Sequence, residues 1–128
     1  MNTAILAAAA LMALVSFAIH TFVGGPYATK PLLAATGLPK ATIWLNYFTW
    51  HIVTLFLLIM SVVLAGGAAG AVHHDAIVLV GVTAAMISML SVAVTFKARI
   101  RPWQFPASYL LGTTALLTFW GASGIVGS

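Results

Sequence analysis

Four long stretches without a charged side chain dominate this sequence and limit what the chain can fold into. Each has 20 or 21 residues, which is the length of an α-helix that crosses the roughly 30 Å hydrocarbon layer of a membrane. Strand-like alternation of apolar and polar residues is absent, and the strands of membrane barrels are only about 10 residues long. The sequence therefore predicts an all-α membrane protein, a four-transmembrane-helix bundle in one domain (1–128), with spans at residues 3–23, 52–71, 76–96 and 106–126.

The composition excludes several classes of protein. Only 5% of the residues are charged and 62% are apolar, whereas a soluble domain carries about 25% charged residues. The net charge of +4 comes without the dense basic face that nucleic-acid binding requires. Cysteine is absent and Asp75 is the single carboxylate, which excludes thiolate chemistry and paired-carboxylate catalysis. No motif of a hydrolase or kinase occurs, so we expect no enzymatic activity.

The positions of the basic residues predict the orientation in the membrane. Lys30 and Lys40 lie between the first two spans, and Lys97, Arg99 and Arg101 lie between the last two. Because Lys and Arg accumulate in short cytoplasmic loops, both termini are predicted to be extracytoplasmic. Lys97, Arg99 and Arg101 are also expected to contact anionic lipid head groups.

The boundaries of the first two spans carry residues with strong local preferences. Gly24, Gly25 and Pro26 are expected to end the first helix. Residues 41–51 contain Trp44 and Trp50, aromatic residues of the kind that gather at membrane interfaces. This segment is predicted to form the interfacial start of the second helix.

Three of the predicted helices carry a face suited to packing inside a bundle. Small residues pack helices closely in lipid, and they recur at steps of three and four on the first and third helices. On the second helix the polar groups gather on one face, which we expect to point inward. The three sets are Ala9, Ala13, Ser16 and His20; Gly81, Ala84, Ala85, Ser88, Ser91 and Thr95; and Trp44, Tyr47, His51, Thr54, Leu58, Ser61 and Ala65.

Two histidines are the main candidates for a binding site. His20 lies near the end of the first span and His51 just before the second, so both imidazoles are expected near the cytoplasmic end, on inward faces. They can be axial ligands of haem b, or they can form a pocket for a quinone or a lipid head group together with Trp50, Trp103 and Arg101. A third interpretation is that each ring bonds a carbonyl or hydroxyl and fixes the register of the helices.

Three short motifs contain these residues. They are H-T-F-V-G-G at His20–Gly25, W-H at Trp50–His51, and R-P-W at Arg101–Trp103 before the last span. In these motifs the chain resembles small four-helix bacterial inner-membrane proteins of unassigned function. In that group His-Ser or His-Thr ends the first helix, Trp-His opens the second, and a Pro-x-Trp-like segment precedes the fourth. Arg101 stands where the group often has a third His. The resemblance implies a four-helix architecture in a bacterial inner membrane.

These observations give an expectation about function. The chain is expected to be a non-catalytic integral membrane protein, an accessory or assembly subunit that packs against other membrane protein subunits and lipids. The alternative is a redox membrane protein that binds haem b or a quinone through His20 and His51.

Overall fold

The computed structural model describes residues 1–124 and is helical nearly throughout. The first helical segment consists of α1 (Thr3–Ala18), the π-helical turn η1 (Ile19–Gly24) and α2 (Gly25–Leu33), and these run on without a break. The other elements are α3 (Lys40–Ala68), α4 (His74–Ala98), the short 3₁₀ turn η2 (Pro102–Gln104) and α5 (Pro106–Ser123). No strand occurs in these 124 residues, so the all-α prediction is confirmed.

Three of the helical segments are long and apolar enough to cross a membrane, namely Thr3–Leu33, Lys40–Ala68 and His74–Ala98. They indicate an integral membrane protein. The fourth predicted span ran from 106 to 126, and its last two residues lie outside the described part of the chain. The helix found there, α5, has 18 residues. It is not among the three segments that are both long enough and apolar enough to cross a membrane.

The prediction that Gly24, Gly25 and Pro26 end the first helix is wrong. The chain stays helical through this point because η1 widens the helix to π geometry just before Pro26. A proline in a helix clashes with the carbonyl four residues earlier and offers no N–H to it. A π turn bonds to the fifth residue instead and moves that carbonyl away. The helix therefore continues to Leu33.

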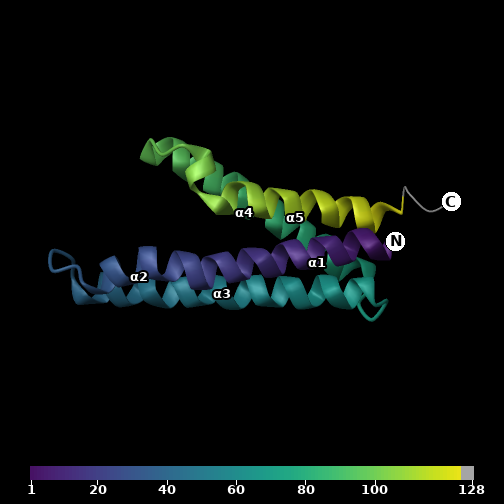
Figure 1. Cartoon of the computed structure of the whole chain (residues 1–128), viewed down its shortest axis with the longest axis horizontal. Helices are drawn as coiled ribbons and strands as arrows, with labels where there is room; N and C mark the ends of the chain where they lie inside the picture. The colour runs from purple at the N-terminus through teal and green to yellow at the C-terminus, as the bar shows by residue number, and fades with distance from the viewer. Residues whose placement is uncertain (125–128) are drawn as a thin grey trace.

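The helices form two antiparallel hairpins (Figure 1). The first hairpin pairs α1, η1 and α2 with α3, and the second pairs α4 with α5. The hairpins join through α1 and α5, which are packed together, so α3 and α4 lie at the outer edges. Figure 1 shows the hairpins close together near the termini and diverging toward the other end.

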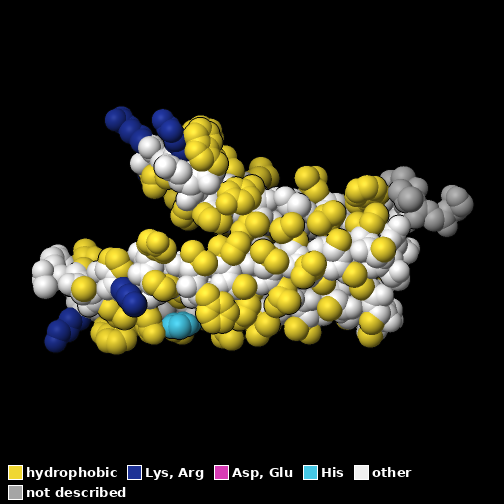
Figure 2. Space-filling model, in the orientation of Figure 1, with side chains coloured by type: hydrophobic (Ala, Val, Ile, Leu, Met, Phe, Trp, Pro, Cys, Tyr) yellow, Lys and Arg dark blue, Asp and Glu magenta, His cyan; other side chains and the backbone are white. Residues whose placement is uncertain are grey.

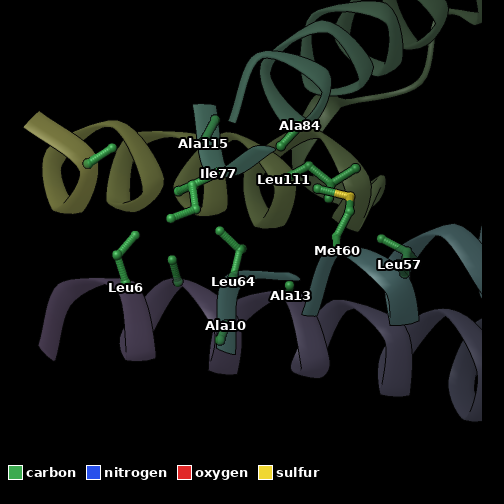
Figure 3. Close-up of a cluster of buried hydrophobic side chains, with 12 residues drawn as sticks. Leu6, Ala10, Ala13, Leu57, Met60, Leu64, Ile77, Ala84, Leu111 and Ala115 are labelled. Atoms are coloured by element: carbon green, nitrogen blue, oxygen red, sulfur yellow. The ribbon is translucent and has the colours of Figure 1, made fainter. Parts of the chain in front are cut away.

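The core lies where the two hairpins meet. Leu6, Leu64 and Ile77 have no exposed surface and come from α1, α3 and α4. Figure 3 shows these three side chains converging, with Met60 reaching toward Leu111 nearby. The amide of Asn2 donates to the carbonyl of Gly121 at 2.8 Å, which ties the start of α1 to the end of α5. The hairpins are therefore joined most firmly at the end that carries the termini.

Two of the predicted packing faces are confirmed and one is wrong. The small-residue faces of α1 and α4 are buried at Ala9, Ala13 and Ser16 and at Gly81, Ala84, Ser88, Ser91 and Thr95. On α3, however, Trp44, His51 and Leu58 of the predicted inward face are exposed. The observed face is offset by about one residue, which is about 100° around a helix. Its buried residues are Ile43, Leu57, Met60, Ser61, Leu64 and Gly67.

Candidate functional site

The π-helical turn brings His20 against α3. The Nε2 of His20 lies 3.2 Å from the carbonyl oxygen of Trp50, and because a carbonyl can only accept, Nε2 donates this hydrogen bond. The same carbonyl also accepts from the hydroxyl of Thr54 at 3.1 Å. The neutral imidazole of His20 then keeps its lone pair on Nδ1. A hydrogen bond of this kind, which fixes the register of two helices, was the third interpretation of His20 from the sequence.

The indole of Trp50 covers the imidazole of His20. The two ring centroids are 3.9 Å apart and the ring planes differ by 16°, which is a stacked pair. Gly24 makes room for the indole, because a Cβ added at Gly24 lies only 3.0 Å from Cη2 of Trp50 and 3.2 Å from its Cζ2. The ring of Trp50 thus lies across η1 and contacts it at two positions one turn apart.

A cleft of about 710 Å³ opens between the two hairpins at the end away from the termini. We call the diverging ends of the two hairpins the arms. Figure 2 shows the hollow between the arms, with apolar side chains along both sides. The stacked pair His20 and Trp50 belongs to one wall, and Leu90 and Val94 of α4 belong to the other. Most of the lining is apolar, and the side chains with hydroxyl, amide or imidazole groups among it are Ser16, His20, Tyr27, Asn46, Thr49, Ser91 and Gln104.

The structure brings together two of the five predicted site residues and separates the other three. His20 and Trp50 line the cleft. His51 is exposed, and its ring meets the edge of Tyr47 with centroids 4.5 Å apart. The prediction of an inward-facing His51 is therefore wrong.

The other two predicted site residues lie on the turn before α5. The guanidinium carbon of Arg101 stands 5.6 Å from the ring centroid of Trp103, and the ring of Trp103 is 66% exposed. Neither residue lines the cleft. Gln104, the next residue along the chain, does.

Sequence reasoning missed Asn46 and Gln104 as polar residues of the cleft wall. Asn46 lies four residues before Trp50, a spacing that places two helical residues on the same face, so a search outward from Trp50 would have found it. Gln104 follows Trp103 directly. No local pattern marks Gln104, because its position depends on how the second hairpin packs.

The geometry does not fit a haem held by two histidines. Axial ligation by both residues needs one free ring nitrogen from each imidazole pointing at a shared iron. The Nε2 of His20 is bonded to Trp50 and one face of its ring is covered, while His51 lies outside the cleft. Within residues 1–124, no three or more His, Cys, Asp or Glu side chains are grouped so that they could hold a metal ion.

Comparison of the chain with protein-family models, with curated proteins and with solved structures finds no match. What the cleft binds is therefore inferred from its own residues. An apolar interior with a few polar groups is the usual character of a small-molecule site, and such sites have volumes of roughly 300–1,000 Å³. The cleft of about 710 Å³ falls inside that range.

Proposed function

We propose that this protein is a non-catalytic integral membrane protein that binds a membrane amphiphile between its two helical hairpins and serves as an accessory subunit of a larger membrane assembly. The observation that carries the proposal is the cleft between the diverging hairpins. Its apolar walls suit a hydrocarbon chain, and its polar side chains suit a head group that needs hydrogen bonds.

Three polar side chains of the cleft wall offer hydrogen bonds to such a ligand. Nδ1 of His20 accepts a hydrogen bond in the tautomer that its contact with Trp50 requires. The amide of Asn46 donates to the carbonyl of Thr42 at 2.8 Å and keeps its second N–H and its oxygen for a ligand. The amide of Gln104 offers donors and an acceptor from the turn before α5. Leu57, Ile87 and Leu111 supply apolar wall from three helices.

The role as an accessory subunit is supported by the outer face of α3. This helix lies at the edge of the molecule, because its main neighbour is α1. Its outward side is apolar along most of its length and includes Trp44, Phe48, Ile52, Leu55, Ile59 and Val62, all exposed. In a bilayer, a bulky apolar face of this kind lies either against lipid or against another helix. We assign this face of α3 to contact with other membrane subunits.

The proposed location is a bacterial inner membrane, as the resemblance of the three short motifs implies. The proposed topology has four crossings and both termini outside the cytoplasm. It is supported by the position of every Lys and Arg at the end of the molecule opposite the termini (Figure 2). With 18 residues, α5 is about 27 Å long, close to the thickness of the hydrocarbon layer.

The test uses the full chain purified in mild detergent and analysed by native mass spectrometry. We expect a stoichiometric assembly with other membrane subunits, and a bound amphiphile on this chain. Val53→Trp fills the cleft and should remove the amphiphile, because Val53 lines the wall. Val82→Trp is the matched control, since Val82 is exposed on α4, outside the cleft and away from the outer face of α3. A free monomer without amphiphile, or equal retention by both variants, contradicts the proposal.

A quinone is the second candidate ligand, and His20 favours it. A quinone carbonyl accepts hydrogen bonds, and the amide groups of Asn46 and Gln104 in the cleft wall can donate them. The reduced form has hydroxyls that can donate to Nδ1 of His20. A quinone that extracts with the protein, and is lost on His20→Phe, would establish this candidate. A Soret band lost on both His20→Ala and His51→Ala would instead establish haem.

A further inference from the structure

The cationic side chains of this protein all lie on the two arms that border the cleft. Lys30 is in α2 and Lys40 begins α3, at the tip of the first hairpin. Lys97, Arg99 and Arg101 lie between α4 and η2, at the tip of the second hairpin. Figure 2 shows Lys and Arg side chains near the free ends of both arms, beyond the hollow between them.

These cations begin where the apolar wall of the cleft ends. Val94 lines the cleft and Lys97 follows it by three residues, which is about one helical turn. On the other arm Tyr27 lines the cleft and Lys30 follows it by three residues in α2. Arg101 precedes the lining residue Gln104 by three. The cleft therefore passes from apolar wall to positive rim on both arms.

No acidic side chain lies near this rim among residues 1–124. The single acidic residue, Asp75, lies in the first turn of α4, at the opposite end of the molecule. Its nearest ionic contact is His74, with Nδ1 3.8 Å from Oδ1 of Asp75. The rim is thus a concentration of exposed positive charge that favours an anionic ligand.

We propose that the amphiphile in the cleft is a phospholipid with an anionic head group. Its acyl chain lies in the cleft against Trp50, and its phosphate lies between the cations of the two arms. This inference rests on the proposed function and names the ligand class. A zwitterionic lipid has the same acyl chains but no net charge to match the rim. A Lys or Arg near an anionic lipid favours binding about fivefold, so removing two cations should lower the affinity roughly 25-fold.

Tryptophan quenching by brominated lipid tests this inference directly, because bromine quenches an indole that it contacts. The reporter protein keeps Trp50 and carries Trp44→Phe, Trp103→Phe and Trp120→Phe. It is reconstituted in phosphatidylcholine nanodiscs that contain a minor fraction of brominated phosphatidylglycerol or, at the same mole fraction, brominated phosphatidylcholine. The control protein keeps only Trp120, which is 51% exposed on α5 and lies outside the cleft.

We expect phosphatidylglycerol to quench Trp50 more strongly than phosphatidylcholine does, with no such preference at Trp120. The preference should fall in Lys30→Gln/Lys40→Gln and also in Lys97→Gln/Arg101→Gln, because the head group lies between the arms. Equal quenching of Trp50 by both lipids overturns the anionic ligand and leaves an amphiphile in the cleft standing. A fall in only one double variant overturns the placement between the arms. Quenching of Trp120 alone overturns the proposed function as well.

Discussion

Replacing His20 with alanine should destabilise the first hairpin by an amount that follows from its contacts. The ring stacks on Trp50 with centroids 3.9 Å apart, and such aromatic pairs contribute about 0.5–1.5 kcal/mol. Its hydrogen bond to the carbonyl of Trp50 adds about 0.6 kcal/mol, and at most about 1.7, for a polar contact between membrane helices. In this variant the carbonyl of Trp50 still accepts a hydrogen bond from the hydroxyl of Thr54 at 3.1 Å, so the substitution leaves no buried acceptor without a donor. We expect His20→Ala to lower the free energy of unfolding by about 1–3 kcal/mol.

Two further variants separate the contributions at His20. His20→Phe keeps a ring over Trp50 and loses the hydrogen bond, so it should cost only about 0.5–1.5 kcal/mol. His51→Ala removes an exposed ring whose partner is Tyr47, four residues earlier on the same helix. Such a pair within one helix contributes about 0.2–0.5 kcal/mol.

The measurement is equilibrium unfolding by sodium dodecyl sulfate in mild-detergent micelles, followed by circular dichroism. The expected order of unfolding free energies is wild type, then His51→Ala, then His20→Phe, then His20→Ala as the least stable. A loss in His51→Ala that equals the loss in His20→Ala would refute this reasoning. It would mean that His51 makes a contact across the bundle comparable to the one that His20 makes with Trp50.

Two other predictions concern helix packing and topology. Gly121→Ala should cost about 1–3 kcal/mol by overpacking, because the added Cβ lies 2.8 Å from Cγ of Leu6 and 3.1 Å from its backbone nitrogen. Gly25→Ala is the control, since an added Cβ there meets nothing within 4 Å outside its chain neighbours. It should change the stability by less than about 1 kcal/mol, because the gain in helix propensity is opposed by the clash with Pro26 that follows; equal stability of the two variants contradicts the packing. A reporter active only in the cytoplasm should be inactive when fused after Ser128 and active when inserted at Thr36; the reverse pattern overturns the orientation.

The faces of α1 and α4 were predictable because small residues mark them, whereas the polar residues of α3 gave the wrong face. The reason lies in how hydroxyl groups are satisfied in a helix. Thr54 of the predicted face donates to the carbonyl of Trp50 at 3.1 Å, four residues earlier on its own helix. Thr49 does the same to Leu45 at 2.9 Å in an exposed hydrogen bond. A hydroxyl that bonds its own helix has no need of a partner inside the bundle. Polar periodicity therefore does not define the inward face of a membrane helix.

Two residues of the candidate site were predictable from the sequence, but their pairing was not. His20 and Trp50 were both singled out from the sequence, yet His51 was expected to be the partner of His20. The offset of α3 by about one residue puts Trp50 where His51 was expected, since adjacent residues point about 100° apart on a helix. The π turn also changes the direction of the side chains after Ala18. Neither effect has a signature in a single sequence.

The cleft is built so that each of its walls is held within its own hairpin. On the first hairpin, His20 is bonded to the carbonyl of Trp50 and stacked on its ring. On the second, the hydroxyls of Ser88 and Ser91 both lie 2.6 Å from oxygens of Ser108, which joins α4 to the start of α5.

The links between the hairpins lie at the other end, where the amide of Asn2 meets the carbonyl of Gly121 and Leu6 packs on Gly121. A ligand that enters between the arms therefore finds both walls already formed and breaks none of these contacts. Because ordering the site beforehand lowers the cost of binding, the affinity of the cleft depends on how its walls and rim match the ligand. The position of the cations at that rim is then what distinguishes one lipid from another.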